Sequence, residues 1–283
     1  MGEAYANSGR YSAALKAFSR AETLNPGNWY ARYILGNVHG ALLDYEEACK
    51  TFRGILAERP SEFHVSLALA QTLLSWSYSC LRSGEFSRSV DLALESAIVA
   101  CNLLKSRPEL SETWKLIGDA AYVGSLVQIS DASKLADLIS ETIRVSHEQV
   151  SDEPDLETVN AEDGGNCSAR SKLLRCNVAA MEKMVALTEG DRLAHSAAHF
   201  NLGVAKYHQM VVVTSGSTSA TPRPVLECFR KAIQLEPRNF QYWNAIGVST
   251  AFHFPAVAEK AFSRSLEINE RVNGSFCNCL HRM

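Results

Sequence analysis

Small, bulky and helix-ending residues recur along the first part of the chain with a period of 34 residues. The recurring positions are Gly2, Ala14, Phe18 and Pro26, which return as Gly36, Ala48, Phe52 and Pro60. Apolar side chains follow helical spacing between them, and a short turn interrupts each period at residues 7–9 and 42–44. A glycine lets two helices approach closely, a phenylalanine fills the next gap, and a proline ends the second helix. The pattern therefore predicts repeated hairpins of two antiparallel helices.

Later hairpins keep this pattern less strictly. A third hairpin begins at Phe63 and is about two helical turns longer than the first two. A fourth begins at Trp114, with its second helix expected somewhere within residues 130–145. Helical spacing returns at residues 172–187 and 199–207, and Trp243 opens a final hairpin. We therefore expect repeats in both halves of the chain.

The segments between the repeats differ in composition. Six acidic residues and no basic residue fall within residues 151–163, followed by a glycine pair, which is typical of a solvated loop. We therefore expect four segments: about four repeats at 1–147, an acidic loop insertion at 148–170, about two repeats at 171–270 with an insertion at 211–224, and an irregular tail at 271–283.

The recurring residues resemble the tetratricopeptide repeat, whose pattern is Trp-x-x-Leu-Gly-x-x-Tyr, then Ala-x-x-x-Phe-x-x-Ala, then Pro. The resemblance implies an all-α solenoid of antiparallel helix hairpins wound into a right-handed superhelix, with irregular insertions. Met1 falls partway through this pattern, so we expect an amino-terminally truncated array. Apolar side chains should then be partly exposed at both ends, namely Ala14, Leu15, Phe18, Phe262 and Leu266.

Composition narrows the range of functions. Apolar residues make up 46% of the chain, enough for a buried core, and the net charge is only −3. No run of lysines and arginines would gather phosphates, so we predict no direct nucleic-acid binding. The eight cysteines form no C-x-x-C pair, which is typical of reduced, intracellular thiols. Neither a leader nor a membrane-spanning stretch is recognisable, so we expect a cytoplasmic protein with no membrane partner, and the nucleus stays open as a second location.

Candidate catalytic and metal-binding patterns are weak. The sequence has no phosphate-binding glycine loop and no nucleophile motif, so we predict no enzymatic activity and no cofactor. His195 and His199 lie four residues apart and would share a helix face, but no carboxylate accompanies them. Cys277, Cys279 and His281 lie too close together for structural zinc and lack a fourth ligand. We therefore predict no metal site.

Repeat solenoids bind peptides or partner helices along a groove lined by their first helices. Aligning the repeats gives a mixed, mostly uncharged set of residues on that side: Tyr33, Asn37, Leu67, Gln71, Lys115, Asp119, Phe200, Val204, Asn244 and Val248. We expect other proteins to bind there.

The long third hairpin and the run Trp114-Lys115-Leu116-Ile117-Gly118-Asp119-Ala120 are similar to the large scaffold subunits of superkiller complexes. That resemblance implies a cytoplasmic scaffold that joins an RNA helicase and WD40-propeller subunits and assists the RNA exosome in 3′–5′ mRNA decay. Two alternatives stay open: a generic peptide-binding adaptor for chaperones or transport, and the repeat region of a repeat-containing glycosyltransferase.

Overall fold

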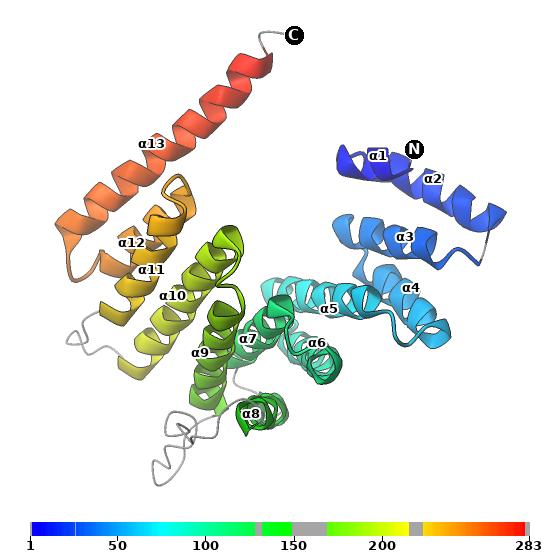
Figure 1. Cartoon of the computed structure of the whole chain (residues 1–283), viewed down its shortest axis with the longest axis horizontal. Helices are drawn as coiled ribbons and strands as arrows, with labels where there is room; N and C mark the ends of the chain where they lie inside the picture. The colour runs from blue at the N-terminus through cyan, green and yellow to red at the C-terminus, as the bar shows by residue number, and fades with distance from the viewer. Residues whose placement is uncertain (1, 26, 128–131, 149–168, 215–222, 281–283) are drawn as a thin grey trace. The chain divides into compact units, whose positions relative to one another are not determined.

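The computed structural model is all-helical throughout the residues that it describes, which are 2–25, 27–127, 132–148, 169–214 and 223–280. The chain divides into two compact units, residues 1–157 and 158–283. Figure 1 shows that, within each unit, helices next to one another in sequence also lie next to one another in space. This arrangement confirms the predicted all-α repeat fold.

The first unit holds three complete hairpins and one further pair of helices. Each hairpin packs within itself and stacks on the next one, while α8 packs against both α6 and α7. The helices are α1 (Gly2–Asn7), α2 (Tyr11–Leu24), α3 (Trp29–Ala41), α4 (Tyr45–Glu58), α5 (Phe63–Ser83), α6 (Phe86–Ser106), α7 (Ser111–Leu126) and α8 (Ala132–Glu148).

The second unit opens with a single helix that packs against the first of two hairpins. These hairpins pair α10 with α11 and α12 with α13. The helices are α9 (Ala169–Leu187), α10 (Arg192–Thr214), α11 (Arg223–Leu235), α12 (Phe240–Thr250) and α13 (Pro255–Leu280).

A glycine on the first helix and a phenylalanine on the second fix the packing of four hairpins. A Cβ atom on Gly36 would lie 2.6 Å from the ring of Phe52, and one on Gly2 would lie 2.8 Å from the ring of Phe18. The same relation joins Gly203 to Phe229 and Gly247 to Phe262. Real side chains do not approach so closely, so each ring occupies the space that a side chain at the glycine would need. Gly36 thus packs against the second helix of its own hairpin.

The third hairpin uses buried hydroxyl groups instead. Ala70 stands where the other hairpins have glycine, and its carbonyl oxygen accepts a 2.8 Å hydrogen bond from Ser96 on α6. Ser77 and Ser89 are fully buried, and each donates to the other's backbone carbonyl, at 2.7 and 2.9 Å. These bonds satisfy groups that would be costly to bury unpaired and fix the register of the two longest helices in the first unit.

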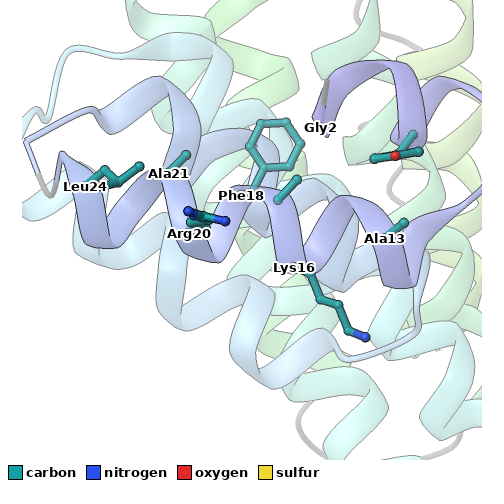
Figure 2. A pocket seen from close by; sticks show the side chains of 9 residues that line it. Gly2, Ala13, Lys16, Phe18, Arg20, Ala21 and Leu24 are labelled. Carbon is teal, nitrogen blue, oxygen red and sulfur yellow. The ribbon is translucent and has the colours of Figure 1, made fainter.

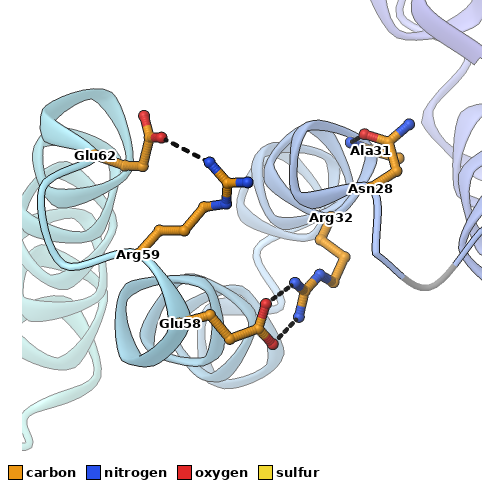
Figure 3. Close-up of polar contacts among 6 residues, drawn as sticks. All are labelled: Asn28, Ala31, Arg32, Glu58, Arg59 and Glu62. Carbon is orange, nitrogen blue, oxygen red and sulfur yellow. Dashed lines mark hydrogen bonds and ion pairs between the residues drawn. The ribbon is translucent and has the colours of Figure 1, made fainter.

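Ionic contacts hold the second hairpin at its surface (Figure 3). The guanidinium of Arg32 on α3 binds both carboxylate oxygens of Glu58 on α4. Arg59 reaches Glu62 at 3.4 Å, and its guanidinium also lies 5.6 Å from the centroid of the Trp29 ring. The side chain of Asn28 caps α3 by accepting from the backbone N–H of Ala31 at 3.2 Å.

The turn inside each of the first three hairpins contains one residue in the left-handed region. These residues are Gly9, Leu43 and Gly84, with φ of 73°, 65° and 84°. In each turn, the N–H of the next residue bonds back five positions to the first helix, at 2.9 Å. This bond belongs to the Schellman ending of a helix, which favours glycine at the left-handed position. Leucine there costs roughly 1–2 kcal/mol of backbone strain.

Several predicted boundaries and exposures were wrong. The tail expected to be irregular from residue 271 is helical as far as Leu280, because extending an existing helix is easier than starting one and no proline interrupts it. The insertion expected at 211–224 is also shorter, since α10 continues to Thr214 and α11 begins at Arg223. The acidic loop lies outside the described residues except at its edges, where Glu148 ends α8 and α9 begins at Ala169.

The expectation of partly exposed apolar side chains at the amino-terminal end was wrong for two of the three residues. Ala14 and Phe18 are buried, with exposed fractions of 0% and 9%, whereas Leu15 is partly exposed, as expected. They pack with Ala31, Leu35 and Val38, so α3 covers part of α2 that the short α1 does not reach. At the other end Phe262 is half-buried against Gly247, whereas Leu266 is exposed, as expected.

Candidate protein-binding surface

Two of the predicted groove residues meet in one groove of the first unit. Asn37 on α3 and Gln71 on α5 occupy the same repeat position 34 residues apart, and both are exposed. They border a groove of about 320 Å³ between the two helices. Its full lining is Asn37, Gly40, Ala41, Leu43, Tyr45, Gln71, Thr72 and Ser75. We call it the α3–α5 groove.

The polar groups of the α3–α5 groove are uncharged. Thr72 and Ser75 each donate a 2.8 Å hydrogen bond to a carbonyl of their own helix, so they offer only oxygen lone pairs to a ligand. The structure gives no hydrogen bond to the side-chain amides of Asn37 and Gln71 within the described residues. An amide can donate and accept at once, which is what a peptide bond requires of a partner.

Tyr33 and Leu67 lie one turn earlier on the same helices and are half-buried. The Tyr33 ring is 6.1 Å from that of Phe52 and 6.2 Å from that of Tyr30. It therefore belongs partly to the hairpin core.

Lys115 and Asp119 form an ion pair on α7 at 2.5 Å. Burial raises the pKa of the Asp119 carboxyl, which the charge of Lys115 opposes. Asp119 also lies near the phenol of Tyr78 on α5, whose pKa is raised, mainly by burial. Because the two predicted residues neutralise each other, they present no net charge to a partner.

In the second unit, two of the predicted residues are half-buried and two are exposed. The Phe200 ring stacks on Tyr242 at 4.9 Å and packs on Phe229 at 5.8 Å, which joins α10, α11 and α12. Val204 is half-buried one turn later on α10, whereas Asn244 and Val248 on α12 are exposed. These last two are the predicted contact residues that this unit leaves accessible.

Sequence reasoning missed Leu43 and Tyr45 as lining residues, because both belong to the turn and start of the second helix. A signal for Leu43 was available. Aligning the turns places it opposite Gly9 and Gly84, so that a large side chain stands where the neighbouring hairpins have none.

A second, more apolar pocket of about 700 Å³ lies beside α1 and α2 (Figure 2). Figure 2 shows the Phe18 ring directed toward Gly2. Lys16 and Arg20 also line the pocket. Leu24, which also lines it, is 78% exposed. The pocket offers few hydrogen-bonding groups and is suited to apolar packing.

The histidine pair of α10 is a packing element. The two Nε2 atoms of His195 and His199 are 3.2 Å apart, and His195 Nδ1 lies 3.3 Å from the hydroxyl of Thr188. Burial, together with His195 and two lysines, lowers the pKa of His199 to about 4. A neutral pair sharing one hydrogen bond fits this geometry. The described part of the chain holds no group of three or more histidine, cysteine or acidic side chains placed to bind a metal.

Comparison with known proteins agrees with the repeat assignment. Residues 1–63 match the family model described as tetratricopeptide repeat. The chain is 31% identical over 261 residues to superkiller protein 3 of Schizosaccharomyces pombe, which covers 88% of this chain and 18% of that protein. It is 26% identical to tetratricopeptide repeat protein 37 of Xenopus laevis, covering 98% of this chain and 17% of that one. It is also 26% identical to superkiller complex protein 3 of Homo sapiens, and the match covers 89% of this chain and 15% of that protein.

Solved structures with a similar arrangement include MamA and yeast Tom70. MamA has a TM-score of 0.44 and 14% identity, covering 85% of this chain and 97% of that one. Tom70 has a TM-score of 0.26 and 14% identity, covering 94% of this chain and 60% of that one. No helix within the described ranges is long and apolar enough to span a bilayer.

The chain spans less than a fifth of the length of the curated relatives that it matches. The repeat match, the helix pairs and the similarity over most of the chain agree with one another. The chain is a tetratricopeptide-repeat protein, homologous to part of superkiller protein 3 and its vertebrate counterparts.

Proposed function

We propose that this chain is a protein-binding part of a superkiller-type scaffold in the cytoplasm. In this role it helps to join an RNA helicase and WD40-propeller proteins, and so assists exosome-dependent 3′–5′ mRNA decay. The observation that supports the proposal is the similarity to superkiller protein 3 over 88% of the chain.

The α3–α5 groove is the part of the surface that we assign to partner binding. Asn37 and Gln71 repeat the same uncharged amide chemistry on consecutive first helices, and both are exposed. A partner segment laid across the two helices would meet one amide per repeat. Repeat solenoids commonly use such surfaces for extended ligands.

Affinity purification from cytosol, followed by quantitative mass spectrometry, tests the proposal. We expect the tagged chain to recover helicase, propeller and exosome subunits, and the double variant Asn37→Ala, Gln71→Ala to recover less of them. The matched control is the double variant Lys50→Ala, Asn102→Ala, which alters exposed residues on the second helices α4 and α6. This control variant should recover as much of the helicase, propeller and exosome subunits as the unmodified chain does.

The alternatives predict other outcomes. Recovery of chaperones or transport factors without the decay proteins would favour the generic adaptor. Co-purification with a glycosyltransferase domain would favour the other alternative, the repeat region of a repeat-containing glycosyltransferase. Equal recovery by both double variants would remove the α3–α5 groove from the proposal.

A further inference from the structure

Leu43 combines an unfavourable backbone with an exposed side chain. Its φ is 65°, in the left-handed region that glycine occupies at the equivalent turns of the neighbouring hairpins. Its side chain is 67% exposed, so burial in this chain does not offset the strain. Strain of this kind tends to persist where a residue serves a function rather than the fold.

The position of Leu43 suggests what that function is. Leu43 lines the α3–α5 groove together with Asn37 and Gln71, and the preceding Leu42 is 41% exposed. Tyr45 adds an aromatic side chain that stacks on Trp76, 6.4 Å away. The groove therefore has an apolar end at the turn and an amide end on the helices.

The chemistry of the lining selects one class of occupant. The backbone groups of a helix are already paired with one another, so amides such as Asn37 and Gln71 bind more readily to an extended chain, whose N–H and C=O groups are free. The volume of about 320 Å³ is at the lower end for ligand clefts, and fits a short peptide stretch.

The absence of charge in the lining narrows the class of ligand further. No lining residue is acidic or basic. The nearest charged group on the turn, Asp44, lies 2.9 Å from the ring of His39 and is already partnered. A charged side chain entering the groove would lose water without gaining a counter-charge.

We propose that the α3–α5 groove binds an extended, uncharged peptide segment of a partner protein, and that Leu43 is the specificity-determining contact for one apolar side chain of that segment. This inference rests on the proposed protein-binding function and adds the class of ligand and the residue that selects it.

A random-peptide display library, panned on the whole chain, provides the probe. We expect the enriched peptides to share one large apolar residue flanked by uncharged residues. The consensus peptide is then synthesised with a fluorescent label, and its Kd is measured by anisotropy. Gly40→Leu is the variant that fills the groove, since a Cβ at Gly40 would meet a single atom, at 3.9 Å. It should prevent binding while the helical content stays unchanged.

Leu43→Gly separates the role of this side chain from its effect on the fold. Glycine suits the left-handed turn, so the melting temperature should stay level or rise by about 2–4 °C. The Kd for the labelled peptide should weaken about tenfold as the apolar contact is lost. Gly84→Leu is the matched control: it introduces the same strain in the next hairpin, where nothing lies within 4 Å of the added Cβ. It should lower the melting temperature and leave the Kd unchanged.

Each result bears on the proposal separately. If Leu43→Gly binds like the unmodified chain while Asn37→Ala with Gln71→Ala weakens binding, the groove still binds protein, but Leu43 does not select the ligand. A charged consensus, or a lower melting temperature for Leu43→Gly, would also overturn the inference. If Gly40→Leu and the double amide variant both leave the Kd unchanged, the groove is not the binding site, and the proposed function fails at this surface as well.

Discussion

Replacing Gly36 by alanine adds one methyl group at the tightest point of the second hairpin. The new Cβ would lie 2.6 and 2.8 Å from two ring carbons of Phe52, well inside van der Waals contact. Phe52 has an exposed fraction of 0% and belongs to a core cluster that includes Leu69 and Leu73, so its ring has little room to move away. The two helices of the hairpin must therefore separate or the ring must leave its preferred rotamer.

The cost can be estimated against a control in the same hairpin. Overpacking a well-filled core costs about 1–3 kcal/mol, while alanine in place of glycine within a helix gains about 1 kcal/mol. Gly54 on α4 has nothing within 4 Å of its Cβ position, so Gly54→Ala should show only the gain. The two variants should thus differ by about 1–3 kcal/mol, which corresponds to about 2–12 °C in Tm for a domain of this size.

Urea and thermal unfolding, followed by the helical circular dichroism signal, would measure this difference. We expect Gly36→Ala to be less stable than Gly54→Ala, and Gly36→Leu to be less stable still. The double variant Gly36→Ala, Phe52→Leu should recover part of the loss, because the smaller side chain leaves room for the methyl group. Equal stability of the two alanine variants would refute the glycine–phenylalanine packing and the repeat register with it.

Three further predictions follow from charge and burial. The pKa of His199 is lowered to about 4 in the folded chain, against about 6.5 when unfolded, so the free energy of unfolding should be highest above pH 6.5 and decline as the pH falls toward 4. Urea titrations at several pH values should show a shallower decline for His199→Gln. Burial raises the pKa of Cys49 and Cys176 to about 11, so iodoacetamide should label both much more slowly in the native chain at pH 8 than in urea, as read by peptide mass spectrometry. With a net charge of −3, the purified chain should bind single-stranded RNA weakly or not at all, and submicromolar, salt-sensitive binding in a filter assay would contradict this.

The sequence predicted helix packing well at positions where a contact accepts only one type of residue. Gly36 and Phe52 could both be assigned to helix packing from the 34-residue period, because a close helix contact needs a small residue and the space beside it needs a large one. Asn37 and Gln71 could be assigned to one surface for the same reason, since they share a repeat position. Periodicity therefore predicted the fold and part of the candidate surface.

Periodicity failed where local rules compete. Phe200 shares its repeat position with Tyr33, but the second unit places an aromatic residue, Tyr242, where its ring can stack. The tail beyond residue 270 has no apolar stripe, yet α13 continues through it, because helix extension does not require packing. Leu43 was overlooked because only the first helices were aligned, whereas its signal lies in the turns, where Gly9 and Gly84 stand at the equivalent positions.

The glycine–phenylalanine contact also bears on how such a gene can grow. In the first two hairpins the glycine and the phenylalanine are 16 residues apart within a period of 34. A tandem duplication of any 34-codon stretch within this region, wherever its breakpoints fall, would reproduce one glycine and one phenylalanine in the correct order and spacing. The copied hairpin would carry its internal contact from the first generation, and only its outer faces would need later substitutions to fit new neighbours. Lengthening by whole periods is thus open to such a chain in a single recombination event.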